Sequence, residues 1–179
     1  SAMIVAEPTS LDVVVAHKGV TRWRCHTSGR AAHSSCPEQG ENAIYRMGQV
    51  ITAFEQYAHL LAREHPHPLL GHPTINLGTI EGGICVNAVP DQCTIELDRR
   101  LLHDEDPQEA RQAAINWLAE HLPSDVAAHV QHDAPFLTSH GLSEQAADQW
   151  SQRVHAVART LAPQAARIGV PYATDAPFF

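Results

Sequence analysis

Four polar residues stand at positions where their side chains could perform chemistry. Glu7 ends a short apolar stretch at a Glu-Pro-Thr turn, His33 stands in a loop, Asn87 follows a pair of glycines, and Arg100 stands in an apolar-alternating run. A carboxylate can bind a metal ion, an imidazole can exchange a proton, and a guanidinium can donate two parallel hydrogen bonds to a carboxylate.

Each of these residues also has an ordinary structural interpretation. Glu7 could be a simple turn residue, and Asn87 could satisfy the turn geometry before Pro90. His33 is one of 13 histidines in the chain. Arg100 could be a surface arginine that protects an edge strand. The residue types by themselves leave both interpretations open.

Cysteine and histidine both bind zinc well, so Cys25, His26, His33 and Cys36 are candidates for a zinc knuckle. The spacing matches no common zinc motif, and Cys25 and His26 would point to opposite faces of a strand. The sequence therefore argues against a metal site at this place.

The first half of the chain predicts strands and one long helix. Ile4–Glu7 predicts a short strand, Asp12–Ser28 predicts one long strand or a bent hairpin, and Arg30–Glu41 predicts a loop. Apolar residues then recur at the helical period, namely Ile44, Met47, Ile51, Phe54, Ala58 and Leu61. This helix is expected to begin at Glu41 or Asn42.

The middle of the chain predicts two adjacent strands and a second helix. His65–Pro73 carries three prolines and a glycine and is expected to be a surface connection. Thr74–Thr79 and Cys93–Leu101 alternate like neighbouring strands. Asp106 is suited to cap a helix that starts with proline, and Asp125–Gln131 alternates like a further strand.

The order strand, helix, strand, strand, helix, strand predicts an α+β domain of the ferredoxin-like, split βαβ type. Such a domain has an antiparallel sheet with both helices on one face. We expect it to cover residues 18–135, with residues 1–17 and 136–179 as fragments of an α/β catalytic domain. Residues 1–3 are interpreted as a tag-cleavage scar.

The last segment predicts a third helix and a terminal strand. Ser143 is suited to cap that helix, whose buried face would contain Ala146, Trp150, Val154, Val157 and Leu161. Residues 168–179 are expected to form a short apolar strand that packs against a further part of a larger protein.

Composition excludes two classes of partner. The formal charge of −8 and the scatter of 12 basic residues argue against a nucleic-acid ligand. The sequence contains no run of about 18 apolar residues, so it predicts no membrane helix. Four cysteines without paired spacing predict free thiols in a reducing cytoplasmic setting.

Four segments, in this order and spacing, resemble the zinc metallopeptidase and deacylase family of acetylornithine deacetylase, succinyl-diaminopimelate desuccinylase and glutamate carboxypeptidase. They are Glu7-Pro8-Thr9-Ser10, Ser28-Gly29-Arg30-Ala31-Ala32-His33-Ser34, Gly78 to Gly83 with Asn87-Ala88-Val89-Pro90, and Asp98-Arg99-Arg100-Leu101. In that family a ferredoxin-like lid domain is inserted into a catalytic domain and forms a homodimer.

The resemblance implies a role for each candidate residue. Glu7 resembles a zinc ligand, and His33 resembles the lid histidine that enters the active site of the partner subunit. Asn87 and Arg100 resemble residues that hold the substrate carboxylate. Thr174 and Asp175 resemble, more loosely, a segment beside the substrate pocket.

The family pattern is incomplete in this chain. The family site holds two zinc ions, and no His-x-Asp pair, Glu-Glu pair or late histidine ligand has a counterpart here. One carboxylate cannot hold two metal ions. We therefore expect a chain that binds no catalytic zinc and is inactive alone, but whose parent hydrolyses the amide bond of a small N-acyl amino acid or peptide.

Two other interpretations remain at this point. The chain could be a stand-alone ferredoxin-like ligand-binding or dimerisation module without enzymatic activity, which would need a self-contained surface at both termini. It could also be a naturally truncated homologue that acts only as a dimeric partner.

Overall fold

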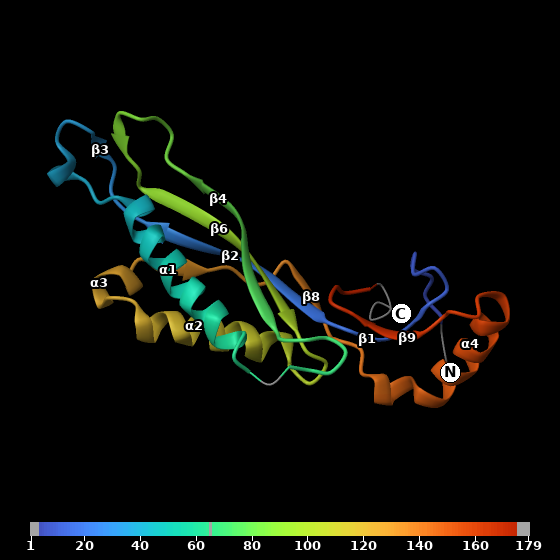
Figure 1. Ribbon diagram of the computed structural model, residues 1–179. Helices are drawn as coiled ribbons and strands as arrows, with labels where there is room; N and C mark the ends of the chain where they lie inside the picture. The colour runs from blue at the N-terminus through green and yellow to red at the C-terminus, as the bar shows by residue number, and fades with distance from the viewer. Residues whose placement is uncertain (1–3, 65, 175–179) are drawn as a thin grey trace.

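The computed structural model of the protein describes residues 4–64 and 66–174. The molecule has two parts along one long axis (Figure 1). A five-stranded sheet with two long helices forms one part, and a two-stranded sheet with a helix forms the other. Strand β1 (Val13–His17) leads directly from the smaller part into β2 (Gly19–Ser28) of the larger one.

The larger sheet has the predicted ferredoxin-like topology. Its strand order is β4 (Thr74–Gly82), β6 (Gln92–Leu101), β2 and β7 (Val130–His132), and neighbouring strands are antiparallel. A short strand β8 (Leu137–Ser139) pairs with the first half of β2. The α+β fold class predicted from the order of elements is therefore confirmed.

Both long helices begin where the sequence predicts. The Asn42 side chain accepts a hydrogen bond from the Tyr45 N–H and caps α1 (Ala43–Leu61). Asp106 accepts from the N–H groups of Gln108 and Glu109 and caps α2 (Pro107–His121). Capping satisfies backbone donors that would otherwise have no partner at a helix start.

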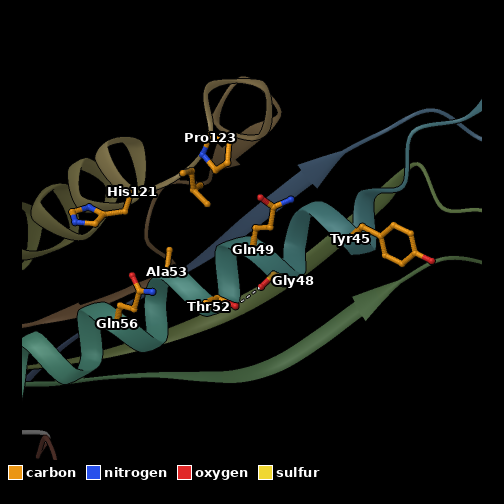
Figure 2. A pocket seen from close by; sticks show the side chains of 9 residues that line it. Tyr45, Gly48, Gln49, Thr52, Ala53, Gln56, His121 and Pro123 are labelled. Atoms are coloured by element: carbon orange, nitrogen blue, oxygen red, sulfur yellow. Dashed lines mark hydrogen bonds between the residues drawn. The ribbon is translucent and has the colours of Figure 1, made fainter.

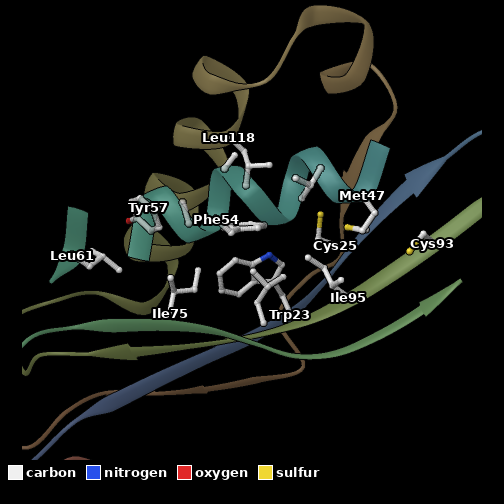
Figure 3. Packing of buried hydrophobic residues seen from close by; sticks show 14 of the residues in the cluster. Trp23, Cys25, Met47, Phe54, Tyr57, Leu61, Ile75, Cys93, Ile95 and Leu118 are labelled. Carbon is white, nitrogen blue, oxygen red and sulfur yellow. The ribbon is translucent and has the colours of Figure 1, made fainter. Parts of the chain in front are cut away.

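One hydrophobic core joins the two helices to one face of the sheet (Figure 3). The sheet supplies odd-numbered residues of β2 and β6, such as Trp23, Ile95 and Leu97, and the helices supply Phe54 and Leu118. The even-numbered residues of these strands lie on the opposite face, which is polar and partly open to solvent.

Three predicted strands are wrong in part. Residues 4–7 form no strand, since a strand needs a neighbour and none pairs with them among the described residues. The long strand or bent hairpin expected over 12–28 is instead two strands of different sheets divided at Lys18, because β1 pairs in parallel with β9 (Arg167–Val170) in the smaller sheet. The strand expected over 125–131 is instead the short helix α3 (Ser124–Ala127), followed by β7.

The loop expected over Arg30–Glu41 contains regular structure. Strand β3 (Ala32–His33) pairs with β5 (Ala88–Val89), and a 3₁₀ turn covers Pro37–Gln39. Two-residue strands give no detectable alternation, so periodicity could not reveal this pairing.

The third helix has a different exposure from the one predicted. Ser143 caps a 3₁₀ turn (Glu144–Ala147) that leads into α4 (Asp148–Leu161). Trp150, Val157 and Leu161 are exposed, although the helical period predicted them to be buried. Periodicity identifies an apolar face but not what covers it. The terminal strand is limited to β9, and residues 175–179 lie outside the described part.

A partly buried histidine, His132, contacts the core and is expected to make it sensitive to acid. The Trp23 indole N–H donates a hydrogen bond of 3.2 Å to His132 Nδ1. Burial, and after it the nearby charges of Arg111 and His26, lower the pKa of His132 from 6.5 to about 4. In the native state the imidazole therefore stays neutral until the pH falls to about 4, whereas the unfolded chain takes up the proton at higher pH.

We expect this protonation to destabilise the fold as the pH falls from about 6.5 to about 4, because the unfolded chain binds the proton first. The loss of unfolding free energy would reach at most about 3 kcal/mol. Urea unfolding of the wild type and of His132→Asn at several pH values would check this. The asparagine keeps an acceptor for Trp23 but cannot titrate, so its stability should change less over this range; equal pH dependence would contradict the assignment.

Candidate functional site

The candidate residues gather at two opposite ends of the large sheet. His33 and Asn87 lie at the outer tip, beyond the end of β6 that carries Gln92. Arg100 lies at the other end of β6, where it is in register with Val20 and close to the crossing into the smaller part. The tip and this crossing are separated by the full length of the sheet (Figure 1).

The length of β6 sets a minimum for this separation. A strand rises about 3.3 Å per residue, so the run from Gln92 to Arg100 alone spans about 26 Å. One substrate cannot contact both ends of such a strand. The structure therefore brings His33 and Asn87 together but does not bring Arg100 to them within one chain.

The tip is held by the short β3–β5 pairing. His33 is in register with Ala88, and the Ser34 N–H donates to the Asn87 carbonyl oxygen at 3.0 Å. Gly83 adopts a positive φ of 73° just before this segment, a conformation that favours glycine. Two segments that are 54 residues apart in sequence thus place His33 and Asn87 side by side, and both residues are exposed.

The His33 ring is held on its Nδ1 side by Ser35. The Ser35 N–H donates to Nδ1 at 3.2 Å, and Ser35 Oγ lies 2.7 Å from the same nitrogen. A backbone N–H can only donate, so Nδ1 carries a lone pair and the ring proton of neutral His33 is on Nε2. Ser35 was not singled out from the sequence, although its position two residues after the histidine was a usable signal.

Arg100 already holds a carboxylate. Its Nε and Nη2 atoms donate to the two oxygens of Asp98 at 2.6 and 3.1 Å. Arg22 also donates to Asp98, at 2.7 Å. The two guanidinium groups and one carboxylate leave net positive charge on the open face of the sheet, which favours an anionic ligand there.

The crossing between the two parts of the molecule contains a buried histidine and lysine. His17 is almost fully buried, and burial lowers its pKa, while the negative charge of Glu7 acts in the opposite direction. The Lys18 ammonium donates to the His72 carbonyl oxygen, and its pKa is lowered by burial first and then by Arg99 and Arg100. Glu7 and Arg100 thus lie near the same crossing.

The remaining predicted site residues are Thr174, Asp175 and the proposed metal ligand Glu7. Thr174 is buried, and Asp175 lies outside the described residues. Within residues 4–64 and 66–174, no group of three or more His, Cys, Asp or Glu side chains is placed to hold a metal ion. The described residues therefore do not fit a complete catalytic zinc centre, and Glu7 could supply at most one ligand of such a centre.

The hollow shown in Figure 2 lies away from these residues. It has a volume of about 340 Å³ and lies between α1 and the end of α2, lined by Tyr45, Gly48, Gln49, Thr52, Ala53, Gln56, His121, Leu122 and Pro123. None of the predicted site residues lines it.

Among the helices of the described residues, none is long and apolar enough to cross a membrane.

Comparison with known proteins gives one family match. The family described as "Peptidase dimerisation domain" matches residues 15–126. An acetylornithine deacetylase of Vibrio cholerae serotype O1 is 32% identical over 191 aligned positions, which cover 98% of this chain and 45% of the relative. An acetylornithine deacetylase of Proteus mirabilis is 37% identical over 101 positions, which cover 55% of this chain and 26% of the relative.

Solved structures share the fold at low sequence identity. An M20 family metallo-carboxypeptidase from Sulfolobus solfataricus has a TM-score of 0.70 at 14% identity, covering 94% of this chain and 56% of that one. An aminopeptidase PepT from Bacillus cereus has a TM-score of 0.69 at 19% identity, covering 97% and 44%. This chain spans about half the length of the first curated relatives that it matches along its whole length.

Proposed function

This chain belongs to the peptidase dimerisation domain family, and from that membership we propose that it is the lid and dimerisation part of a metal-dependent amidohydrolase. The substrate of the whole enzyme is a small N-acyl amino acid or peptide. The similarity to acetylornithine deacetylases over nearly the whole chain favours an N-acyl amino acid. Zinc is the proposed metal, with two ions in each active site and most of their ligands outside this chain.

The proposed lid covers residues 18–135, and residues 1–17 and 136–179 belong to the catalytic part. The change from one sheet to another at Lys18 supports the first boundary, because among the described strands β1 pairs with β9 whereas β2 pairs within the large sheet. The exposed apolar side chains of α4 support its assignment to a larger catalytic core, which would bury them.

The observation that carries the proposal is the separation between the His33 tip and the Glu7 end of the molecule. The sheet between them is at least about 26 Å long, which no single small substrate could span. A complete site then requires two subunits, in which the tip of one lid enters the catalytic centre of its partner. Dimerisation and catalysis are thereby one function of this fold.

In this arrangement each candidate residue has a defined task. His33 presents its Nε2–H to the oxyanion that develops on the scissile carbonyl group. Asn87 of the same tip adds a neutral donor, and Arg100 of the other subunit attracts the substrate carboxylate to a face that also carries Arg22. Glu7 supplies one ligand of the metal centre, and closure of the two subunits excludes water.

The direct test is hydrolysis by the full-length protein. A panel of N-acetyl and N-succinyl amino acids and dipeptides should be cleaved when zinc is present and spared after chelation. The isolated 179-residue chain should be a dimer by light scattering, with the same mass with and without zinc. Hydrolysis that survives complete metal removal, or a monomeric full-length protein with full activity, would overturn the proposal.

A further inference from the structure

The ring of the exposed tip histidine is fixed from its Nδ1 side by two contacts with Ser35. His33 Nδ1 accepts a hydrogen bond from the Ser35 N–H at 3.2 Å and lies 2.7 Å from Ser35 Oγ. An exposed imidazole without such contacts would exchange its neutral proton between the two nitrogens and rotate about its side-chain bonds. Ser35 therefore restricts both the tautomer and the orientation of His33.

The backbone around the pair is also restrained. The Cys36 N–H donates to the His33 carbonyl oxygen at 2.9 Å, which closes a tight turn around Ser34 and Ser35. The Ser34 N–H is bonded to the Asn87 carbonyl oxygen at 3.0 Å. The turn thus fixes Ser35 beside the ring, while the β3–β5 pairing fixes the turn relative to Asn87.

The Ser35 hydroxyl has one other neighbour. Cys36 Sγ lies 3.8 Å from Ser35 Oγ, and a thiol is a weak acceptor and a weak donor. The Ser35 hydroxyl therefore forms its stronger hydrogen bond by donating to Nδ1 of His33. The backbone N–H of Ser35 donates to the same nitrogen. Both donors favour the same tautomer, with the proton on Nε2.

We propose that Ser35 is a positioning residue that fixes His33 in the Nε2–H tautomer and directs this N–H away from the loop. This inference rests on the proposed function, because the aimed donor matters only where an oxyanion forms. A donor that is already oriented needs no reorganisation when charge develops, which is the main source of its catalytic value. His33 touches the reacting atoms, whereas Ser35 acts through His33.

The tautomer can be measured in the 179-residue chain without any activity. Two-dimensional ¹⁵N–¹H spectra of the histidine rings at about pH 8.5, where imidazoles are neutral, distinguish a protonated from an unprotonated Nδ1. His33→Gln assigns the His33 signals among those of the 13 histidines. The expected wild-type spectrum shows His33 with Nδ1 unprotonated and Nε2 protonated.

Three variants then test whether the Ser35 hydroxyl controls the tautomer of His33. Ser35→Ala removes the hydroxyl donor but keeps the backbone N–H, so it should lower the Nε2–H fraction of His33 in part. Ser35→Thr should restore this fraction, and the neighbouring Ser34→Ala should leave it unchanged as a matched control. An Nδ1–H tautomer in the wild type, or identical His33 signals in wild type and Ser35→Ala, would overturn the assignment.

The full-length enzyme supplies a second readout. Ser35→Ala should lower kcat about 10-fold with KM changed less than about 2-fold, since the loss is confined to the transition state, and Ser35→Thr should recover most of it. An unchanged kcat, with the tautomer altered, would refute the catalytic part of the inference. Absence of any hydrolysis by the wild type would instead refute the proposed function and leave the tautomer result standing.

Discussion

Two inactive variants of the full-length enzyme are expected to restore activity when they are combined. His33→Ala removes the proposed oxyanion donor and should lower kcat about 100- to 1000-fold. Glu7→Ala removes a proposed metal ligand and should inactivate its own site. If the tip of one subunit serves the centre of its partner, a mixed dimer has one site with both residues intact. Random mixing should then give roughly a quarter of the wild-type activity.

The structural reason for this expectation is the distance between the two residues in one chain. His33 lies beyond one end of β6, and Glu7 acts electrostatically on His17 near the other end. Steady-state kinetics after unfolding and refolding the mixture would measure the recovery. The control is each variant refolded alone. If mass spectrometry verifies mixed dimers and their activity does not exceed that of the controls, His33 does not act across the interface.

A charge at the exposed edge of the large sheet should weaken dimer formation. Strand β4 is an edge strand with nine residues, and its only charged side chain is Glu81. Edge strands that stay monomeric are usually protected by lysine, proline or short length, and β4 lacks the first two and is long. This edge is therefore the expected place for the second copy, which could continue the sheet across a two-fold axis.

Ile80 is the best position for this test. It is in register with the buried Ile95, so it points to the helix side, yet it is 56% exposed. Packing of a second copy against β4 and the start of α1 would bury it. Ile80→Glu would place a charge in that contact and should raise the dimer dissociation constant about 100-fold, which corresponds to about 2.7 kcal/mol.

Sedimentation equilibrium of the 179-residue chain would give this constant. The matched control is Val157→Glu, because Val157 is 64% exposed and apolar but lies on α4 in the other part of the molecule. The control should dimerise as the wild type does. If Ile80→Glu dimerises with unchanged affinity and remains folded by circular dichroism, the interface lies on another surface.

The helices, the main strands and the order of elements were predictable from the sequence because their signals are local. The caps at Asn42 and Asp106 act within three residues of themselves. The alternation in β6 reports directly that one face of the strand is buried. These short-range patterns were enough to predict the ferredoxin-like topology, and the motifs around His33 and Asn87 were enough to identify the candidate residues.

Only the tertiary structure decided how these residues are grouped. The pairing of His33 with Ala88 joins segments with no detectable periodicity, and the pairing of β1 with β9 divides a run that reads as one strand. The contacts of Arg100 with Asp98 and the distance from the tip to the crossing depend on the register and length of the sheet. Local sequence encodes which residues prefer a strand or helix, but the free energy of packing decides which strands meet, and this sets where the chemistry can occur.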